Sequence, residues 1–184
     1  RQGAKGGPKV TTFSYFGNFA IAMSEGEIAH VRRIWADGKE LDQNDFTIRT
    51  YRGADDQLPD PLIEAKQGAG NAPSYRGTAY VVFDRFPLEN FGNRIPQFSF
   101  EVLRPVNSLN AKIKAVTIIP GSTEYGYAPL PVTRQVQEGE TVSQNRHVQH
   151  GATDWAASID ELQALCPNLE SVARGVTGDG NNLR

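Results

Sequence analysis

The sequence predicts a mainly β protein of the α+β class. An antiparallel β unit of barrel or sandwich type comes first, followed by an extended connection and a helix–strand tail. Two patterns predict this order: apolar residues alternate with a period of two over several short segments separated by turn residues, and apolar residues recur at helical spacing near the carboxyl end. The expected divisions are a linker over 1–9, the β unit over 10–120, the connection over 121–152 and the tail over 153–184.

Composition narrows the possible classes of function. The 184 residues are 39% hydrophobic and include 18 glycines and 11 prolines, which is typical of a turn-rich globular protein. A net charge of −2, with basic residues interleaved among acidic ones, does not favour a nucleic-acid groove. The single cysteine, Cys166, excludes an internal disulfide framework. No apolar run reaches the roughly 20 residues of a membrane span.

Both ends of the chain look internal to a longer polypeptide. The opening stretch, 1–7, lacks an initiator methionine and an apolar signal core. The closing stretch, 178–184, is rich in glycine and asparagine. We therefore expect a fragment.

The first half of the β unit is predicted from alternation and turn signals. Residues 12–23 alternate, and 28–35 form the returning strand; one face of the first strand carries Phe13, Tyr15, Phe19, Ile21 and Met23. Asp37-Gly38 is a two-residue hairpin signal because both residue types tolerate a positive φ. A further strand is expected over 46–51 and a short helix over 60–67.

The most distinctive stretch is a pair of strands over 75–84 and 96–104. One face of the first strand is expected to carry Tyr75, Gly77, Ala79, Val81 and Phe83, and one face of the second Phe98, Phe100 and Val102. The connection between them, 86–94, holds apolar residues among turn formers, so we expect it to be packed down. Within it, Phe91 is expected to enter the core, and Asn93 and Arg94 to hydrogen-bond to backbone.

The carboxyl-terminal part is predicted as strand, connection, helix and strand. Residues 113–119 form a strand that Pro120-Gly121 ends, and Thr153 caps a helix over 154–165. The buried face of that helix is expected to carry Trp155, Ile159, Leu162 and Cys166. A strand over 171–177 follows.

No catalytic or metal site emerges from the residue pattern. His147 and His150 lie three apart, but no third ligand accompanies them, so a polar surface loop is the better interpretation; His30 is expected to face solvent. The acidic pairs are read as solvated surface, with Asp160-Glu161 on the exposed side of the helix; the other pairs are Asp55-Asp56 and Glu138/Glu140. No cofactor is expected, because no phosphate-binding loop or nucleophile motif is present.

An ordered series of short motifs resembles a known family. The series comprises Tyr75-Arg76-Gly77, then Phe91-Gly92-Asn93-Arg94 with Pro96, then Phe100-Glu101-Val102. It resembles the central tail-tip, or baseplate hub, proteins of long-tailed bacteriophages, and in particular the large hub protein of alphaproteobacterial gene transfer agents. Tyr-Arg-Gly also occurs at 51–53, but different flanking residues argue against a duplication.

The resemblance implies a structural, non-enzymatic role in a phage-like tail tip. It implies a homotrimer that contacts the distal tail and other tail-tip proteins, surrounds a lumen through which DNA passes, and presents surfaces to a host glycan. The particle would assemble in the bacterial cytoplasm. In that family a TIM-barrel-like, glycoside-hydrolase-like domain follows, and 153–184 resembles its opening edge, although Arg174 and Gly175 depart from the strongly apolar strand of the family.

Two alternatives remain open. The chain could contribute to a cell-wall glycoside hydrolase, which rests on the neighbouring barrel of the family and on 153–184. It could also be a carbohydrate-binding β domain, which rests on the aromatic residues of the β unit. Activity on a cell-wall polymer would distinguish the first of these, and saturable glycan binding the second.

Overall fold

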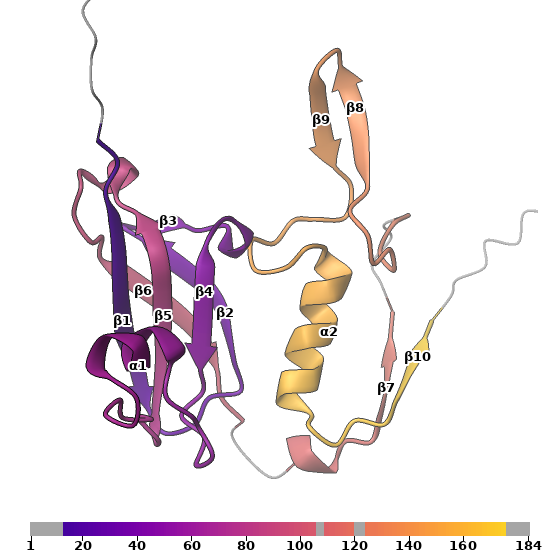
Figure 1. The fold of residues 1–184 in the computed structure, drawn as a ribbon. Helices are drawn as coiled ribbons and strands as arrows, with labels where there is room; N and C mark the ends of the chain where they lie inside the picture. The colour runs from indigo at the N-terminus through magenta and orange to yellow at the C-terminus, as the bar shows by residue number, and fades with distance from the viewer. Residues whose placement is uncertain (1–12, 106–108, 120–123, 176–184) are drawn as a thin grey trace, which may run out of the picture.

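The computed structural model describes residues 13–105, 109–119 and 124–175. The linker expected over 1–9, the predicted stop at Pro120-Gly121 and the last residues of the strand expected over 171–177 lie outside the described residues. The described part is mainly β, as predicted, and Figure 1 shows a β sandwich on one side, a helix beside it and a pair of strands beyond the helix.

The strands are β1 (Phe16–Glu25), β2 (His30–Ala36), β3 (Lys39–Glu40), β4 (Thr47–Tyr51), β5 (Thr78–Pro87), β6 (Phe98–Leu103), β7 (Ala115–Ile118), β8 (Thr133–Gln137), β9 (Glu140–Ser143) and β10 (Ser171–Arg174). The helices are α1 (Pro61–Gln67) and α2 (Asp154–Leu165). Short 3-10 turns occur at Gln43–Asp45, Glu89–Phe91 and Asn110–Lys112.

Two antiparallel three-stranded sheets form the sandwich. One has the strand order β1-β5-β4 and the other β3-β2-β6. Their inner faces meet in an aromatic layer, in which Phe19 and Phe83 of the first sheet pack against Phe98 of the second. Of the two predicted architectures, barrel or sandwich, the described residues form the sandwich.

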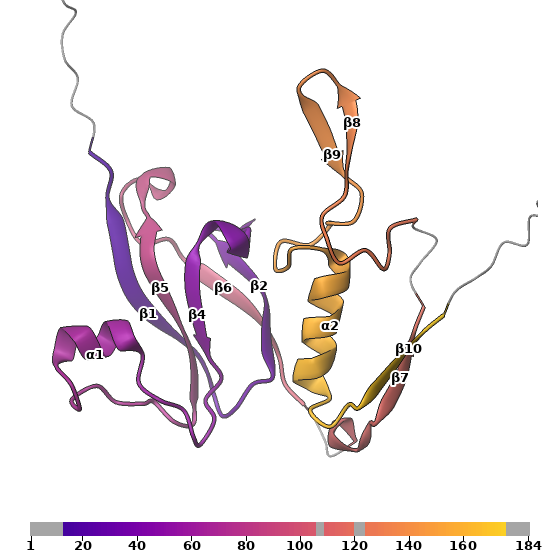
Figure 2. The same ribbon diagram turned by 45° about the vertical axis from the view of Figure 1, so that its right-hand side comes forward.

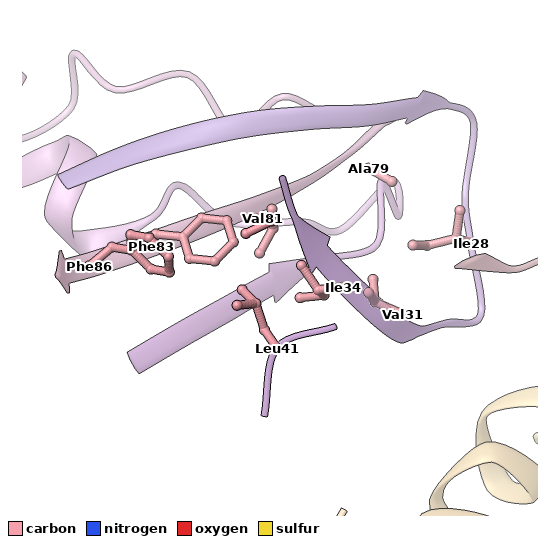
Figure 3. Close-up of a cluster of buried hydrophobic side chains, with 9 residues drawn as sticks. Ile28, Val31, Ile34, Leu41, Ala79, Val81, Phe83 and Phe86 are labelled. Atoms are coloured by element: carbon pink, nitrogen blue, oxygen red, sulfur yellow. The ribbon is translucent and has the colours of Figure 1, made fainter. Parts of the chain in front are cut away.

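The core lies between these sheets and is built mainly by β2 and β5. Alternate residues of β5 point inward, including Ala79, Val81 and Phe83, as the period of two predicts (Figure 3). Val31 and Ile34 of β2 are both buried although they lie three positions apart, because a register shift interrupts β2 between Val31 and Arg33. The bulge leaves Arg32 and Arg33 outside the core.

The predicted hairpin turn at Asp37-Gly38 is confirmed. Both residues have positive φ, 49° and 81°, and Trp35 pairs with Glu40 across the turn. This is the backbone geometry whose twist matches that of antiparallel strands.

Helix α1 packs on the outer face of the β1-β5-β4 sheet (Figure 2). Asp60 caps it, accepting hydrogen bonds from the backbone N–H groups of Leu62 and Ile63, and Pro61 occupies the first turn. The bounds match the helix predicted over 60–67.

The rest of the chain forms a β–α–β arrangement. Strand β7 leads through the β8–β9 hairpin to α2, which returns the chain to β10, and β10 pairs with β7 in parallel. Helix α2 stands between the sandwich and this strand pair (Figures 1 and 2). Thr153 caps α2 as predicted, its Oγ1 accepting from the N–H of Ala156 at 3.1 Å.

Three details differ from the sequence-based expectations. Strand β7, grouped with the β unit by the sequence, pairs with β10 instead. The connection expected over 121–152 contains the β8–β9 hairpin, whose Gly139 has a positive φ of 79°. The strand expected over 12–23 is β1, shifted to Phe16–Glu25, because its pairing with β5 begins at Phe16 and Pro87.

Candidate functional site

The two Tyr-Arg-Gly tripeptides meet in space. The N–H of Gly77 donates to the carbonyl of Gly53 at 3.0 Å, and the N–H of Gly26 donates to the carbonyl of Gly77 at 2.7 Å. The ring of Tyr80 stacks on Tyr51 at 4.5 Å between centroids and meets the edge of Tyr75 at 5.4 Å. This end of the sandwich is therefore closed by backbone contacts between the β1–β2 turn and the chain on either side of the 54–74 loop.

Gln57 ties that loop down. Its side-chain oxygen accepts from the N–H of Gly53 at 2.7 Å, and its amide nitrogen donates to the carbonyls of Ser74 and Tyr75 at 2.8 and 3.0 Å. Arg76 extends over the same residue, with Nε donating to the Gln57 carbonyl. A buried amide with both ends satisfied fixes the loop's path.

A buried charge cluster lies beneath α1. Asp60 has no exposed surface, and its carboxylate accepts from Arg49 Nε at 2.7 Å and from the Tyr51 hydroxyl at 2.8 Å, besides the two N–H groups of α1. Arg49 also pairs with Asp84 at 3.1 Å. The cluster joins α1, β4 and β5, so it connects the loop between the two tripeptides to the sheet.

The cluster changes the titration of its members. Burial alone would raise the pKa of Asp60, but the hydrogen bonds from Arg49, Tyr51 and the helix N–H groups hold that pKa below its ordinary value. Burial, followed by the bond to Asp60, raises the pKa of Tyr51 to about 12. Burial likewise raises the pKa of Tyr80 to about 12. All three groups therefore keep one charge state across neutral pH, which suits a structural cluster.

The connection after β5 is packed down, as expected, but its details differ. Phe91 is half-buried at the margin of the core and stacks on Phe86 at 5.5 Å. Gly92 and Asn93 both have positive φ, and the N–H of Asn93 donates to the carbonyl of Leu88. The expected anchor to backbone is thus made by the main chain of Asn93.

Arg94 reaches a side chain of the β2–β3 turn rather than the local backbone alone. Its Nη2 donates to the Asp37 carboxylate at 2.8 Å, and the N–H of Gln97 donates to the same carboxylate at 2.9 Å. These bonds hold the pKa of Asp37 below its ordinary value. The connection is therefore joined to the β2–β3 turn, and Pro96 beside it is buried.

The motif residues do not form one site. Tyr75, Arg76 and Gly77 precede β5, whereas 91–96 follow it, so the length of a ten-residue strand separates the groups by about 30 Å. Phe100 lies on β6 opposite Ile34 and packs against the core. The motifs bracket the two ends of β5 and stabilise the sandwich at each.

Ion pairs join the sandwich to α2. The bulge in β2 turns Arg32 outward, where its Nε donates to Glu161 of α2 at 2.8 Å. The neighbouring Arg33 pairs within the sandwich instead, its Nε donating to Glu101 of β6 at 2.5 Å. His150, whose side chain is buried, lies 2.9 Å from the same Glu161 carboxylate. Glu161 was expected to be exposed, and the structure corrects this: the neighbouring Asp160 is exposed, but Glu161 faces β2.

His30 was also expected to face solvent, and it is half-buried against α2. Burial lowers its pKa below the ordinary value, an effect that the nearby Glu161 carboxylate opposes and His150 adds to. Sequence analysis missed this junction because the periodicity of β2 does not show which element covers its outer face.

Among the described residues no group of His, Cys, Asp and Glu is arranged to hold a metal ion. His147 pairs with Asp154 at 2.6 Å, whereas His150 turns to Glu161. The carboxylates of Asp55, Asp56, Glu138 and Glu140 are exposed. Of the helices described, none is long and apolar enough to cross a membrane.

A hollow of about 330 Å³ opens at the start of α2. Its lining includes the rings of Tyr125 and Trp155 and the polar groups of Gln144, His147 and Asp154. Behind it, Tyr127 packs edge-on against Trp155, and its hydroxyl lies within hydrogen-bond distance of the carbonyls of Ile118 and Gly175, which places β7 beside the end of β10. The hollow combines flat apolar rings with planar polar groups.

Comparison with known proteins gives a similarity to a solved structure. No protein-family model matches the chain, and no curated protein matches it. A chain in the structure described as the virion of a native gene transfer agent (GTA) particle shares 48% sequence identity with it. The match covers 52% of this chain and 23% of that chain, with a TM-score of 0.46.

This protein is similar to a component of a virion-like particle. The similarity rests on the sequence identity. The TM-score of 0.46 is too low to support an argument from the fold. The match spans about a quarter of the length of the related chain.

The parts of the molecule that sequence analysis missed are those made by distant pairs: the cluster around Asp60, the contact between the two tripeptides and the junction at Glu161.

Proposed function

We propose that the chain is a structural part of a phage-like or GTA-like tail tip, within a baseplate hub, and that it acts by assembly. The 48% identity with a chain of a GTA particle carries this proposal. The ordered motifs of the sequence support the finer assignment to the hub. The polar groups agree with it: the Asp60 and Glu161 carboxylates are held by arginine and serve to join elements.

The proposed hub is a homotrimer that contacts the distal tail and other tail-tip proteins around a lumen through which DNA passes. The sandwich supplies a rigid body for such a ring, because both ends of β5 are locked by backbone and side-chain bonds. Rigid subunits lose little conformational entropy on assembly. The particle would assemble in the cytoplasm of the bacterial host.

We assign 10–105 to a hub domain and the β7–α2–β10 segment to the edge of a further α/β unit. Strand β10 is exposed along its length, and parallel strands are ordinarily buried on both faces. Additional strands would cover this pair in a larger sheet. The barrel-like domain of the resembling family is the natural candidate.

The test is to locate the chain within particles. A tagged copy of the complete protein replaces the native one, particles are purified by density gradient, and the tag is located by gold labelling. We expect label at one end of the tail, and particles without tips when the gene is deleted. Particles that are complete without the protein would refute the proposal.

Glycan binding is a second candidate function, favoured by the hollow at α2. Aromatic rings beside carboxylate, amide and imidazole groups match the flat faces and hydroxyls of a sugar ring. Titration of the protein with cell-wall and surface oligosaccharides tests this function. The Trp155→Ala variant is titrated beside the wild type. Saturable binding that the substitution abolishes would support this role; equal binding by both proteins would count against the hollow.

A further inference from the structure

The β8–β9 hairpin is an arm that projects from the molecule. Figures 1 and 2 both show it extending away from α2 and from the sandwich. Every residue of β8, and all of β9 except Ser143, is exposed, and the two strands pair only with each other among the described strands. An isolated two-stranded hairpin is marginally stable in water. The arm therefore lacks the packing that ordinarily stabilises such a hairpin.

The root of the arm is nevertheless held firmly. Asn145, only 4% exposed, donates through its amide to the carbonyls of Ala128 and Leu130, and its side-chain oxygen accepts from the N–H of Val132 at 2.8 Å. The N–H of Gln144 adds a bond to the carbonyl of Val132. A buried polar side chain satisfied in this way specifies one backbone path. The arm is thus a directed projection.

The arm exposes two valines. Val142 pairs with Arg134 and shares its face of the hairpin with Glu140, and Val136 lies at the register shift between Gln135 and Gln137. Val136 and Val142 are 47% and 44% exposed. The opposite face carries Thr141 and Gln135, a polar pair. Exposed valines on a fixed arm are the expected feature of an element that docks on another surface.

The matching surface lies at the start of β1. Phe13, Tyr15 and Phe16 are 71%, 54% and 52% exposed, an unusual density of open aromatic side chains. The guanidinium of Arg85 lies over the Phe16 ring at 5.1 Å. We call these four residues the aromatic patch. Tyrosine, phenylalanine and arginine are enriched at the centres of protein interfaces.

The patch is shaped by a strained stretch of backbone. Arg85 has a φ of 53°, which is uncommon for a non-glycine residue, and its N–H donates to the Asn18 side chain at 2.6 Å. A register shift between Gly17 and Phe19 lies beside it. Bulges of this kind redirect side chains, and strain is commonly retained where it serves a function.

We infer that the β8–β9 arm of one copy docks on the aromatic patch of a second copy of this chain. The patch is cationic through Arg85, and the tip of the arm carries the exposed carboxylates of Glu138 and Glu140. Strand β1 is also an edge strand of its sheet, so a hairpin strand can pair with its free side. Charge, apolar area and strand pairing favour the same partner.

The positions of arm and patch suit a ring. In both views the arm and the start of β1 lie toward the same end of the molecule but on opposite flanks (Figures 1 and 2). A contact between two different surfaces is heterologous, and repetition of such a contact closes a ring when the rotation permits. This inference rests on the proposed hub function, to which it adds the contacting residues.

The experiment measures the mass of the complete protein by sedimentation velocity over a range of concentrations. Val142→Asp places a charge at an exposed valine of the arm, and Thr141→Asp is its matched control on the opposite face of the hairpin. We expect Val142→Asp to weaken self-association at least about tenfold and Thr141→Asp to change it little. Because both positions are exposed, both variants are expected to unfold at the wild-type midpoint, which checks folding.

A charge exchange identifies the partner surface. Replacing Glu138 and Glu140 by lysine should weaken assembly, and adding Arg85→Glu should restore it. Wild-type association that is insensitive to Val142→Asp, or an exchange that restores nothing, overturns the contact. A protein that stays monomeric also overturns it. Gold label at the tail tip in that case leaves the proposed function intact, so the two failures are distinguishable.

Discussion

Arg32 and Glu161 lie 129 positions apart in the chain, yet Nε of the arginine donates to the glutamate carboxylate at 2.8 Å. The bond joins the outer face of the sandwich to α2, and buried His150 contacts the same carboxylate. It marks the surface on which the two parts of the described chain meet.

Replacing Glu161 should loosen α2 without unfolding the sandwich. Glu161→Gln weakens the charged bonds to Arg32 and His150, and hydrogen bonds to charged groups contribute about 1.5–3 kcal/mol. We expect faster amide hydrogen exchange over 154–165 and little change in β5. Asp160→Asn, one residue away and exposed, is the matched control. Equal exchange in both variants would contradict a role for the Glu161 bonds.

Asp60 should be among the polar residues most sensitive to substitution. Asp60→Ala leaves Arg49 and Tyr51 without their carboxylate and removes the cap of α1, and breaking a buried pair costs about 3–5 kcal/mol. Asp84→Asn removes the more exposed partner of Arg49 and should cost about 1 kcal/mol or less. Urea unfolding measures both, and similar midpoints would show that the cluster is not stabilising.

Gly53 should tolerate no side chain. A Cβ there would lie 3.0 Å from the backbone nitrogen of Ala79 and 3.1 Å from the carbonyl oxygen of Gly26, at a φ of 86°. Gly38 has a similar φ of 81° but open space around it. Gly53→Ala should therefore lower the melting temperature well beyond the loss in Gly38→Ala, where only the cost of about 1–2 kcal/mol for left-handed backbone applies.

Phe91 and Phe83 should differ in their contributions to the free energy of unfolding. Phe83 is fully buried, so Phe83→Ala should cost about 3–5 kcal/mol. Phe91 is half-buried at the margin of the core, so Phe91→Ala should cost about half as much. Chemical denaturation of the two variants gives the comparison; a larger loss at Phe91 would place it in the core after all.

Stability should fall as the pH drops below about 6.5, the ordinary pKa of histidine. The pKa of His30 is lowered in the folded state, so the unfolded chain takes up the proton first and folding becomes less favourable as pH falls. Glu161, His150, Asp160 and Arg32 are the charged and titratable groups that act on this imidazole.

The carboxylates affect the stability at lower pH than His30 does. Asp60, Glu101 and Asp154 have lowered pKa values, so the stability they contribute is lost only as pH falls below about 4. Unfolding midpoints at pH 8, 7, 6 and 5 therefore lie above the range in which these carboxylates titrate. Between pH 7 and 5, the unfolding midpoint of His30→Gln should change less with pH than that of the wild type. An unchanged pH dependence would assign the effect to another group.

Local sequence determined much of the secondary structure. Helix α2 begins after Thr153 and α1 after Asp60 because short polar side chains at those positions satisfy the first N–H groups, and Asp37-Gly38 turns because both residues accept a positive φ. Alternation shows which residues share a face of β5 as far as Phe83 and of β6. These features depend on residues within a few positions of one another.

Only the tertiary structure decided which of these elements meet. The pairing of β7 with β10, the contact of Gly53 with Gly77, the charge cluster at Asp60 and the burial of His30 all join residues far apart in the chain. Periodicity shows that a face is covered but carries no label for the covering element, since hydrophobic burial is non-directional. The β8–β9 arm was not predicted from the sequence for a related reason. Its strands are mostly polar and show no clear apolar alternation, and its root is held by one buried asparagine.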